Sequence, residues 1–196
     1  MTQKRGTLFV ISAPSGAGKR TVLQEVFKRD SNLAFGVSAT SRPPRRGEVD
    51  GRDYVFLERD EFRRRIDEGG FVEWAEVHGN LYGTLHEQLD RHLASGKDVI
   101  LELDVQGMRS IKKLMPGAVS VFIMAPTFAE LANRLRSRGT DAEEEIVLRL
   151  KNARAEAAAR NEYDHIIVNK NVGDAAAAME AIIRAQRRRA TKTTEE

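Results

Sequence analysis

The sequence has no cysteine and a single tryptophan among its 196 residues. Disulfides, thiolate nucleophiles and cysteine metal sites are therefore excluded, and a chain without cysteine suits a reducing compartment. The net charge is also small: the sequence has 32 Lys and Arg and 29 Asp and Glu, which gives +3. An excess of this size does not indicate bulk binding to nucleic acid, so the placement of the basic residues matters more than their number.

Long apolar runs are missing as well. A membrane span needs about 18 apolar residues, and the best run, 118–125, contains a serine and stops at Pro126. The run Leu8–Ile11 follows two basic residues but is shorter than the core of a signal peptide, about 7–15 residues. We therefore expect a cytoplasmic protein with no membrane partner. The four histidines lack metal-ligand spacing, and no G-x-S-x-G elbow occurs.

The remaining composition, 41% hydrophobic and 31% charged, is that of an ordinary globular protein. Apolar runs at residues 8, 99, 119 and 165 alternate with helical patterns, which favours a parallel sheet with right-handed crossovers. The segment from about 36 to 83 differs, with short strands, turns and one helix. We expect it to form an inserted lobe over the carboxyl ends of the sheet strands, where open α/β sheets bind ligands.

The expected strands are 8–12, 35–39, 54–57, 71–77, 98–103, 119–124 and 165–169, and the expected helices include 21–29, 60–68, 84–96, 105–115 and 174–189. Thr84, Thr127 and Thr140 each precede a glutamate by three residues, the pattern of a capping box at a helix start. Two arginine-rich helices are expected on either side of residues 138–140. The polar tail from Ala190 is expected to fray.

A glycine-rich loop, Ser12-Ala-Pro-Ser-Gly-Ala-Gly-Lys-Arg-Thr21, lies between a predicted strand and a predicted helix. Gly16 and Gly18 allow the backbone amides to converge on a phosphate, and the helix N-terminus adds its positive dipole. Lys19 reaches the β- and γ-phosphates. A merely tight turn needs no lysine at that point, so the loop predicts phosphate binding.

Two positions of this loop depart from the pattern G-x-x-x-x-G-K-[ST]. Ala13 replaces the first glycine, and Arg20 replaces the Ser or Thr that ligates Mg²⁺. Thr21 follows directly and can take the metal itself or through water. Without a bound anion, Arg20 opposes the helix dipole by about 0.3–1 kcal/mol; with nucleotide bound, it can neutralise phosphate charge instead.

The loop from residue 40 to 53 carries four arginines among prolines and glycines. Such runs are usually solvated surfaces, but the stiff backbone here lets the guanidinium groups converge on one anion. The segment 71–84 then supplies carboxylates, a phenol and a hydroxyl.

From about residue 8 to 185 the chain resembles the guanylate kinase family, on five motifs in family order: the phosphate loop, Ser-Arg-Pro-Pro-Arg-Arg-Gly-Glu48, Gly-Asn-Leu-Tyr-Gly-Thr84, Leu-Glu-Leu-Asp-Val-Gln-Gly107 and Arg-Leu-Arg-Ser-Arg-Gly-Thr140. The resemblance implies an α/β fold, namely a P-loop kinase three-layer core with a parallel sheet, formed by residues 1–35, 87–125 and 160–196. It also implies a GMP-binding lobe at 36–86 and a helical lid at 126–159.

The same resemblance implies roles for individual residues. The implied catalytic residues are Lys19, Arg42, Arg45, Arg134, Arg138 and Arg149. The implied ATP-binding residues are Ala13, Pro14, Ser15, Gly16, Ala17, Gly18, Lys19, Arg20, Thr21 and, on the adenine side, Asn169. The implied GMP-binding residues are Ser38, Arg42, Arg45, Glu48, Tyr54, Glu73, Tyr82, Thr84 and Glu102. Thr21 and Asp104 are the candidates for holding Mg²⁺.

Structural alternatives remain open for several of these residues. Thr84 can cap a helix, and Asp104 can be the N-cap before Val105. Glu73 can be a strand carboxylate satisfied within the protein, and Tyr54 and Tyr82 can belong to the core of the lobe. The lid arginines can form a charged hairpin with Glu143, Glu144 and Glu145.

The implied reaction is ATP + GMP ⇌ ADP + GDP, with dGMP as a second acceptor. It needs no general base, because the acceptor phosphate is already anionic. A catalytically silent binding module of the same family is the alternative function, and only Arg20 favours it. Nucleic-acid binding through Arg184 and residues 187–189 is not expected, since arginines at a helix end complement its dipole. Monomer and homodimer remain open.

Overall fold

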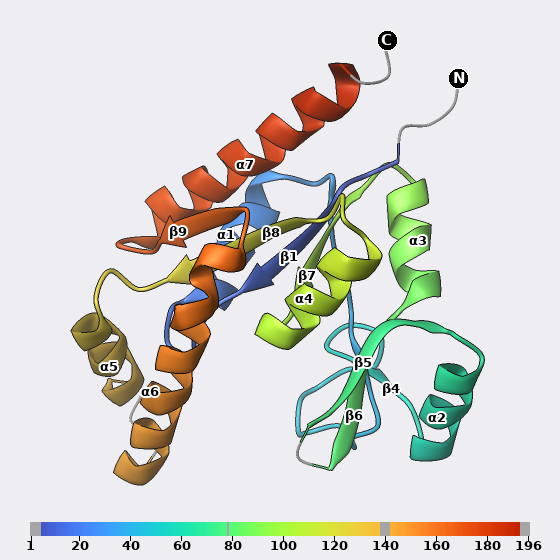
Figure 1. Ribbon diagram of the computed structural model, residues 1–196, viewed down its shortest axis with the longest axis horizontal. Coiled ribbons are helices and arrows are strands. Elements are labelled where there is room, and N and C mark those ends of the chain that lie inside the picture. The colour runs from blue at the N-terminus through green and yellow to red at the C-terminus, as the bar shows by residue number, and fades with distance from the viewer. Residues whose placement is uncertain (1–4, 78, 138–141, 193–196) are drawn as a thin grey trace. The chain divides into compact units, whose positions relative to one another are not determined.

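The computed structural model describes residues 5–77, 79–137 and 142–192. Five strands form the larger sheet, in the order β2-β7-β1-β8-β9 (Figure 1). They are β1 (Leu8–Ser12), β2 (Leu33–Phe35), β7 (Asp98–Glu102), β8 (Val119–Met124) and β9 (His165–Val168). The pairs β2/β7 and β8/β9 are parallel. All five residues of β1 are buried, as expected of a strand inside a parallel sheet.

Four strands form the smaller sheet, in the order β4-β3-β6-β5. They are β3 (Ala39–Thr40), β4 (Val55–Phe56), β5 (Phe71–Val77) and β6 (Asn80–Leu85). β5 and β6 are antiparallel neighbours, and helix α2 (Arg59–Asp67) packs beside this sheet. Phe62 of α2 stacks on Phe71 of β5 with ring centroids 4.3 Å apart. These rings join Ala39, Leu81 and Leu85 in a small apolar core.

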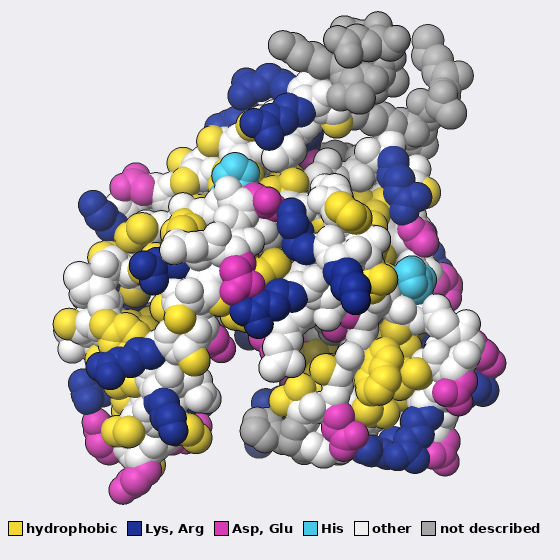
Figure 2. Space-filling view, viewed as in Figure 1, with side chains coloured by type: hydrophobic (Ala, Val, Ile, Leu, Met, Phe, Trp, Pro, Cys, Tyr) yellow, Lys and Arg dark blue, Asp and Glu magenta, His cyan; other side chains and the backbone are white. Residues whose placement is uncertain are grey.

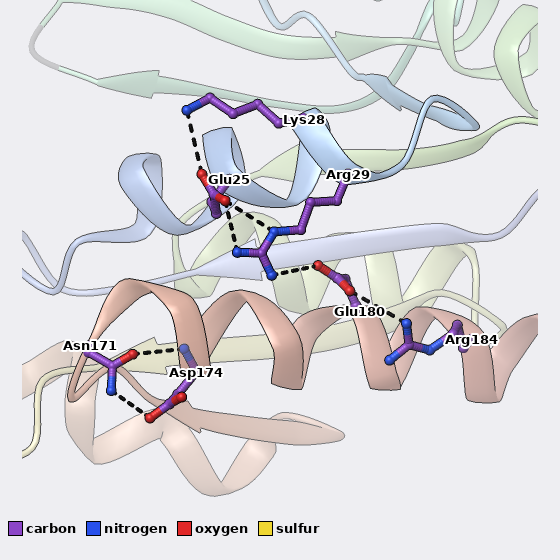
Figure 3. Close-up of polar contacts among 7 residues, drawn as sticks. All are labelled: Glu25, Lys28, Arg29, Asn171, Asp174, Glu180 and Arg184. Carbon is purple, nitrogen blue, oxygen red and sulfur yellow. Dashed lines mark hydrogen bonds and ion pairs between the residues drawn. The ribbon is translucent and has the colours of Figure 1, made fainter.

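The other helices are α1 (Lys19–Arg29), α3 (His86–Ala94), α4 (Val105–Leu114), α5 (Phe128–Arg136), α6 (Glu143–Ala158) and α7 (Val172–Lys192), with a 3₁₀ turn at Ala159–Glu162. α7 runs beside α1, and Figure 3 shows Arg29 of α1 bonded both to Glu25 and to Glu180 of α7. α5 and α6 pack against each other. Among the described residues, none of these helices has the length and apolar sequence that crossing a membrane requires.

Two compact units divide the chain. The first comprises residues 1–9, 32–102 and 106–118, and the second comprises 10–31, 103–105 and 119–196. The division expected from the sequence into core, lobe and lid stays a prediction. On the face that Figure 2 draws, basic and acidic side chains are interspersed, in keeping with the small net charge.

Several predicted elements differ in the structure. The strand expected at 35–39 is two strands, β2 and β3, with Gly36 between them. A Cβ at Gly36 would come within 2.1 Å of the Leu101 side chain, so the backbone there lies close against β7. α1 begins at Lys19 rather than residue 21, because Gly18 in the left-handed conformation is its N-cap.

The capping box expected at Thr84 is wrong. Thr84 lies within β6, and α3 begins only at His86, with Leu85 as N-cap and no side-chain cap. At Thr127 the prediction is confirmed, since its Oγ accepts a hydrogen bond from the Glu130 amide at 3.0 Å. The third proposed cap, Thr140, lies outside the described residues, and α6 begins at Glu143 with Ala142 as N-cap.

The last helix is longer than expected. α7 begins at Val172, two residues early, and continues to Lys192 through the segment expected to fray. Asn171 stabilises its start: Figure 3 shows the Asn171 side chain accepting a bond from the Asp174 amide, at 2.8 Å, and donating to the Asp174 carboxylate. The first of these bonds satisfies one backbone N–H that a helix start otherwise leaves free.

Candidate active site

The phosphate loop lies between β1 and α1, as the sequence predicts. Gly16 and Gly18 adopt φ of 87° and 84°, in the left-handed region that favours glycine. The loop turns tightly, since the Ala17 amide donates to the Pro14 carbonyl at 3.0 Å. Gly18 is the N-cap of α1, so the first free amides of the helix start at the end of the loop. This arrangement can bind a phosphate chain.

The first turn of α1 is basic and holds no acidic residue. Lys19 is half-buried at its first position, whereas Arg20 and Thr21 are exposed. Positive charge at a helix N-terminus is unfavourable unless an anion binds there. The first turn therefore suits a bound phosphate, with Lys19 as the cation nearest to the loop.

The phosphate loop packs against the helical pair α5/α6. Ala17 is fully buried in an apolar cluster with Ala125 after β8, Leu131 of α5 and Ala153 of α6. The two helices that carry the candidate lid arginines thus contact the loop directly. A displacement of either helix changes the surroundings of the loop.

A half-buried carboxyl group, Glu156 of α6, lies close to the same loop. Burial raises the pKa of Glu156, the negative charge of Asp104 raises it further, and the positive charge of Lys19 lowers it. Asp104 and Lys19 therefore both lie near Glu156, although Asp104 follows β7 and Glu156 lies on α6. Nothing in the local sequence around Glu156 indicates this proximity.

The residues expected to hold Mg²⁺ fit that ion by their chemistry. Thr21 and Asp104 are exposed residues whose side chains carry oxygen atoms, and Mg²⁺ is usually bound by one or two carboxylates together with waters and substrate phosphates. Within residues 5–77, 79–137 and 142–192, no group of three or more His, Cys, Asp or Glu side chains is arranged to hold a metal alone.

Two of the candidate lid arginines have partners in this structure. Arg134 Nε donates to Glu130 at 2.9 Å, and Arg134 Nη2 donates to the Asn169 carbonyl at 3.1 Å. Arg149 forms an ion pair with Glu145 at 2.7 Å. The expected pairing of lid arginines with glutamates thus holds for Arg149, while Arg134 is held beside the phosphate loop. Arg138 lies outside the described residues.

The other unit contains the predicted acceptor cluster. Arg42 follows β3 and donates to both oxygens of Glu48, at 2.9 Å each. Its guanidinium carbon lies 5.3 Å from the ring centroid of Tyr54 and 5.8 Å from that of Phe56. The Glu48 carboxylate, and after it the Tyr82 hydroxyl, raise the pKa of Arg42.

Glu48 also organises the backbone of the arginine loop. Its Oε2 accepts a bond from the Arg45 amide at 2.7 Å, so one carboxylate holds both arginine positions. The Arg42 guanidinium, followed by the Arg45 amide, lowers the pKa of Glu48. The Arg45 side chain itself is exposed. The sequence predicted Glu48 as a GMP ligand; in this structure its partners are Arg42 and Arg45.

The two tyrosines pack edge to face, with ring centroids 6.1 Å apart. Burial raises the pKa of Tyr54, and the charge of Glu102 contributes to the same shift, which places Glu102 near this cluster. Phe56, for which the sequence predicted no functional role, is the second aromatic ring near the Arg42 guanidinium, after Tyr54. The structure therefore brings together Arg42, Glu48, Tyr54, Tyr82 and Glu102.

The predicted guanine-reading residues Glu73 and Thr84 face each other across β5 and β6. The Thr84 hydroxyl donates to Glu73 Oε1 at 2.7 Å, and Thr84 is only 2% exposed. A carboxylate is the kind of acceptor that N–H donors such as those of guanine require. Ser38 lies at the start of the same sheet, where its carbonyl accepts from the Val55 amide at 2.9 Å.

The glycine loop between β1 and α1 defines a nucleotide-binding protein of the P-loop class, and the arginine cluster adds a second site suited to an anion. The family model described as guanylate kinase matches residues 5–186. The chain is 45% identical over 188 residues to a guanylate kinase of Thermotoga maritima, covering 96% of this chain and 91% of that protein. It is 47% identical over 181 residues to a guanylate kinase of Rubrobacter xylanophilus, covering 92% and 95%.

A solved structure agrees with these relatives. The crystal structure of guanylate kinase from Anaplasma phagocytophilum matches with a TM-score of 0.74 at 34% identity, covering 94% of this chain and 88% of that chain. The chain therefore belongs to the guanylate kinase family and has the P-loop kinase fold.

Proposed function

We propose that this protein is a guanylate kinase that transfers the γ-phosphoryl group of ATP reversibly to GMP or dGMP, with Mg²⁺. The observation that carries this proposal is the match to the guanylate kinase family over residues 5–186, in a chain that keeps Lys19, Arg42 and Arg45. The relatives that support it are guanylate kinases of similar length.

On the donor side, the amides of residues 16–20 and the Lys19 ammonium bind the triphosphate of ATP. The remaining loop residues, Ala13, Pro14, Ser15 and Thr21, shape the loop and its exit into α1. Lys19 acts as a positive charge on the β- and γ-phosphates, where negative charge accumulates during transfer. Mg²⁺, when bound through Thr21 and Asp104, supplies further charge neutralisation at the phosphates.

On the acceptor side, Arg42, Arg45, Tyr54 and Tyr82 bind the phosphate of GMP. Arg42 is held in place by Glu48 and the neighbouring rings before substrate arrives, which lowers the entropy cost of binding. Glu73 accepts from guanine N1–H and N2, while Ser38, Thr84 and Glu102 complete the contacts to the base. AMP presents a donor where GMP has O6, so it leaves buried polar groups unpaired.

The transfer itself then needs positioning and charge rather than a protein nucleophile. The acceptor phosphate oxygen is anionic at neutral pH, and no general base is required. Arg134, Arg138 and Arg149 neutralise charge on the moving phosphoryl group, and closure of lobe and lid excludes water that would otherwise accept it. Arg149 exchanges its contact with Glu145 for phosphate in this process.

The silent-module alternative gains no support from the structure, since Lys19 and Arg42 have the surroundings that phosphate binding needs. We also propose that the protein is located in the cytoplasm. ADP release tests the function: it should require GMP, proceed more weakly with dGMP, need Mg²⁺ and be poor with AMP or UMP. No turnover with any acceptor would favour the silent module.

A further inference from the structure

Asn169, the residue after β9, is linked to three separate elements. Its side-chain Nδ2 donates to the Ala17 carbonyl of the phosphate loop at 2.8 Å, across 152 positions of the sequence. Its amide donates to Met124 of β8 at 2.8 Å, and its carbonyl accepts from Arg134 of α5 at 3.1 Å. Asn169 is only 2% exposed. A side chain so buried has little freedom to serve other partners.

The orientation of this amide follows from its partner. The Ala17 carbonyl can only accept, so the nitrogen of Asn169 must face it, and a flipped amide would bring two oxygens together. The Asn169 Oδ1 is buried without a hydrogen-bond partner. In this orientation Asn169 makes the bond to the phosphate loop but leaves its own Oδ1 unsatisfied, which is unfavourable for a buried acceptor.

The bond acts on a peptide group that matters for phosphate binding. The Ala17 carbonyl and the Gly18 N–H belong to one planar trans peptide, so they point in opposite directions. Because Asn169 holds the carbonyl, the Gly18 N–H is held facing away from Asn169. Gly18 tolerates many backbone conformations, so without this bond rotation of the peptide meets less resistance. A Cβ at residue 18 would come within 2.5 Å of the Asn169 nitrogen, so glycine is also required for the contact.

We propose that Asn169 is a positioning residue: its side chain fixes the Ala17–Gly18 peptide so that the loop is preformed for the triphosphate of the donor, whatever base that donor carries. This role rests on the proposed binding of ATP at the loop. It differs from a direct contact with adenine, because it acts through the bond from Nδ2 to the Ala17 carbonyl and involves no atom of the base. Arg134, bonded to the carbonyl of the same residue, links α5 to this contact.

The test uses two variants of the full-length chain. Asn169→Ala removes the donor, and Asn169→Asp keeps the shape while replacing the nitrogen by an acceptor oxygen, so it remains informative if the alanine variant does not fold. Asn171→Ala is the matched control. Asn171 lies two residues after Asn169, and its side chain bonds to Asp174 at the start of α7 (Figure 3). Wild-type turnover with ATP and GMP is measured first, which tests the proposed function separately.

The informative readouts are the KM for ATP and the inhibition constant of inorganic tripolyphosphate, which carries no base. We expect both constants to rise together by about tenfold in both Asn169 variants, equivalent to about 1.4 kcal/mol, while the KM for GMP changes less than about twofold. The Asn171→Ala enzyme should keep wild-type constants. A higher KM for ATP with unchanged tripolyphosphate inhibition would assign Asn169 to adenine and overturn the proposal. Unchanged constants for both, or an equal loss in Asn171→Ala, would overturn it as well.

Discussion

Glu48 offers the sharpest test of how the acceptor site is organised. It accepts two bonds from Arg42 at 2.9 Å and one from the Arg45 amide at 2.7 Å. Glu48→Gln keeps the size of the side chain but removes the charge and turns one acceptor into a donor that faces the guanidinium. Arg42 then loses one of its two bonds and is no longer held in a single orientation.

The size of the effect follows from the burial of this pair. A hydrogen bond to a charged group contributes about 1.5–3 kcal/mol. The Arg42 side chain is 11% exposed and that of Glu48 is 20% exposed, so solvent screening is moderate. Loss of this preorganised contact should therefore raise the KM for GMP by about tenfold. The KM for ATP should stay unchanged, because the variant lies on the acceptor side.

The assay is ADP release coupled to NADH oxidation, with GMP varied at saturating ATP. Glu61→Gln serves as the control, since Glu61 pairs with Arg64 and Arg65 on α2 and has no proposed contact with substrate. A Glu48→Gln enzyme with unchanged KM for GMP would refute the positioning of Arg42. A lower KM would show that Glu48 competes with the GMP phosphate for Arg42, which contradicts the reasoning equally.

Three further predictions concern other parts of the molecule. Thr84→Val removes the donor to Glu73, so the KM for GMP should rise about tenfold while that for ATP holds; an unchanged KM for GMP contradicts this role. Arg64 and Arg65 lower the pKa of Glu61 to about 2. The stabilisation from this lowered pKa is complete above pH 4.5 and disappears as the pH falls toward 2. Thermal scans near pH 7 should therefore show a lower melting temperature for Glu61→Gln than for wild type, and the difference should shrink in acid. A difference that does not change with pH argues against the ion pairs. Arg20→Ser restores a hydroxyl to the loop pattern, and the Mg²⁺ concentration for half-maximal activity should fall; an unchanged requirement counts against that metal position.

The phosphate loop is the part of the site that the sequence predicts best. Its signal is local: two glycines and a lysine between an apolar run and a helical pattern need no distant partner to be recognised. The structure agrees, with both glycines at positive φ and the helix starting at Lys19. The order of strands and helices along the chain is predictable for the same reason, because hydrophobic periodicity is a local property.

Contacts between distant segments could not be predicted in this way. Thr84 matches a capping box by spacing, but pairing of β6 with β5 places it opposite Glu73, and the strand contact outweighs the local helix signal. Similarly, the bond from Asn169 to Ala17 and the approach of Glu156 to Asp104 and Lys19 depend on how β9 and α6 pack. Such pairs have no spacing pattern, because tertiary packing alone brings them together.

The measurement that tests the proposed activity most directly is the initial rate of ADP release from ATP and Mg²⁺ with GMP, compared with AMP at the same concentration. Arg42, Glu73 and Thr84 are the contacts proposed for a guanine nucleotide, so rapid release with GMP and little with AMP is the expected result. Equal rates with the two acceptors would contradict the assignment of the acceptor site to guanine.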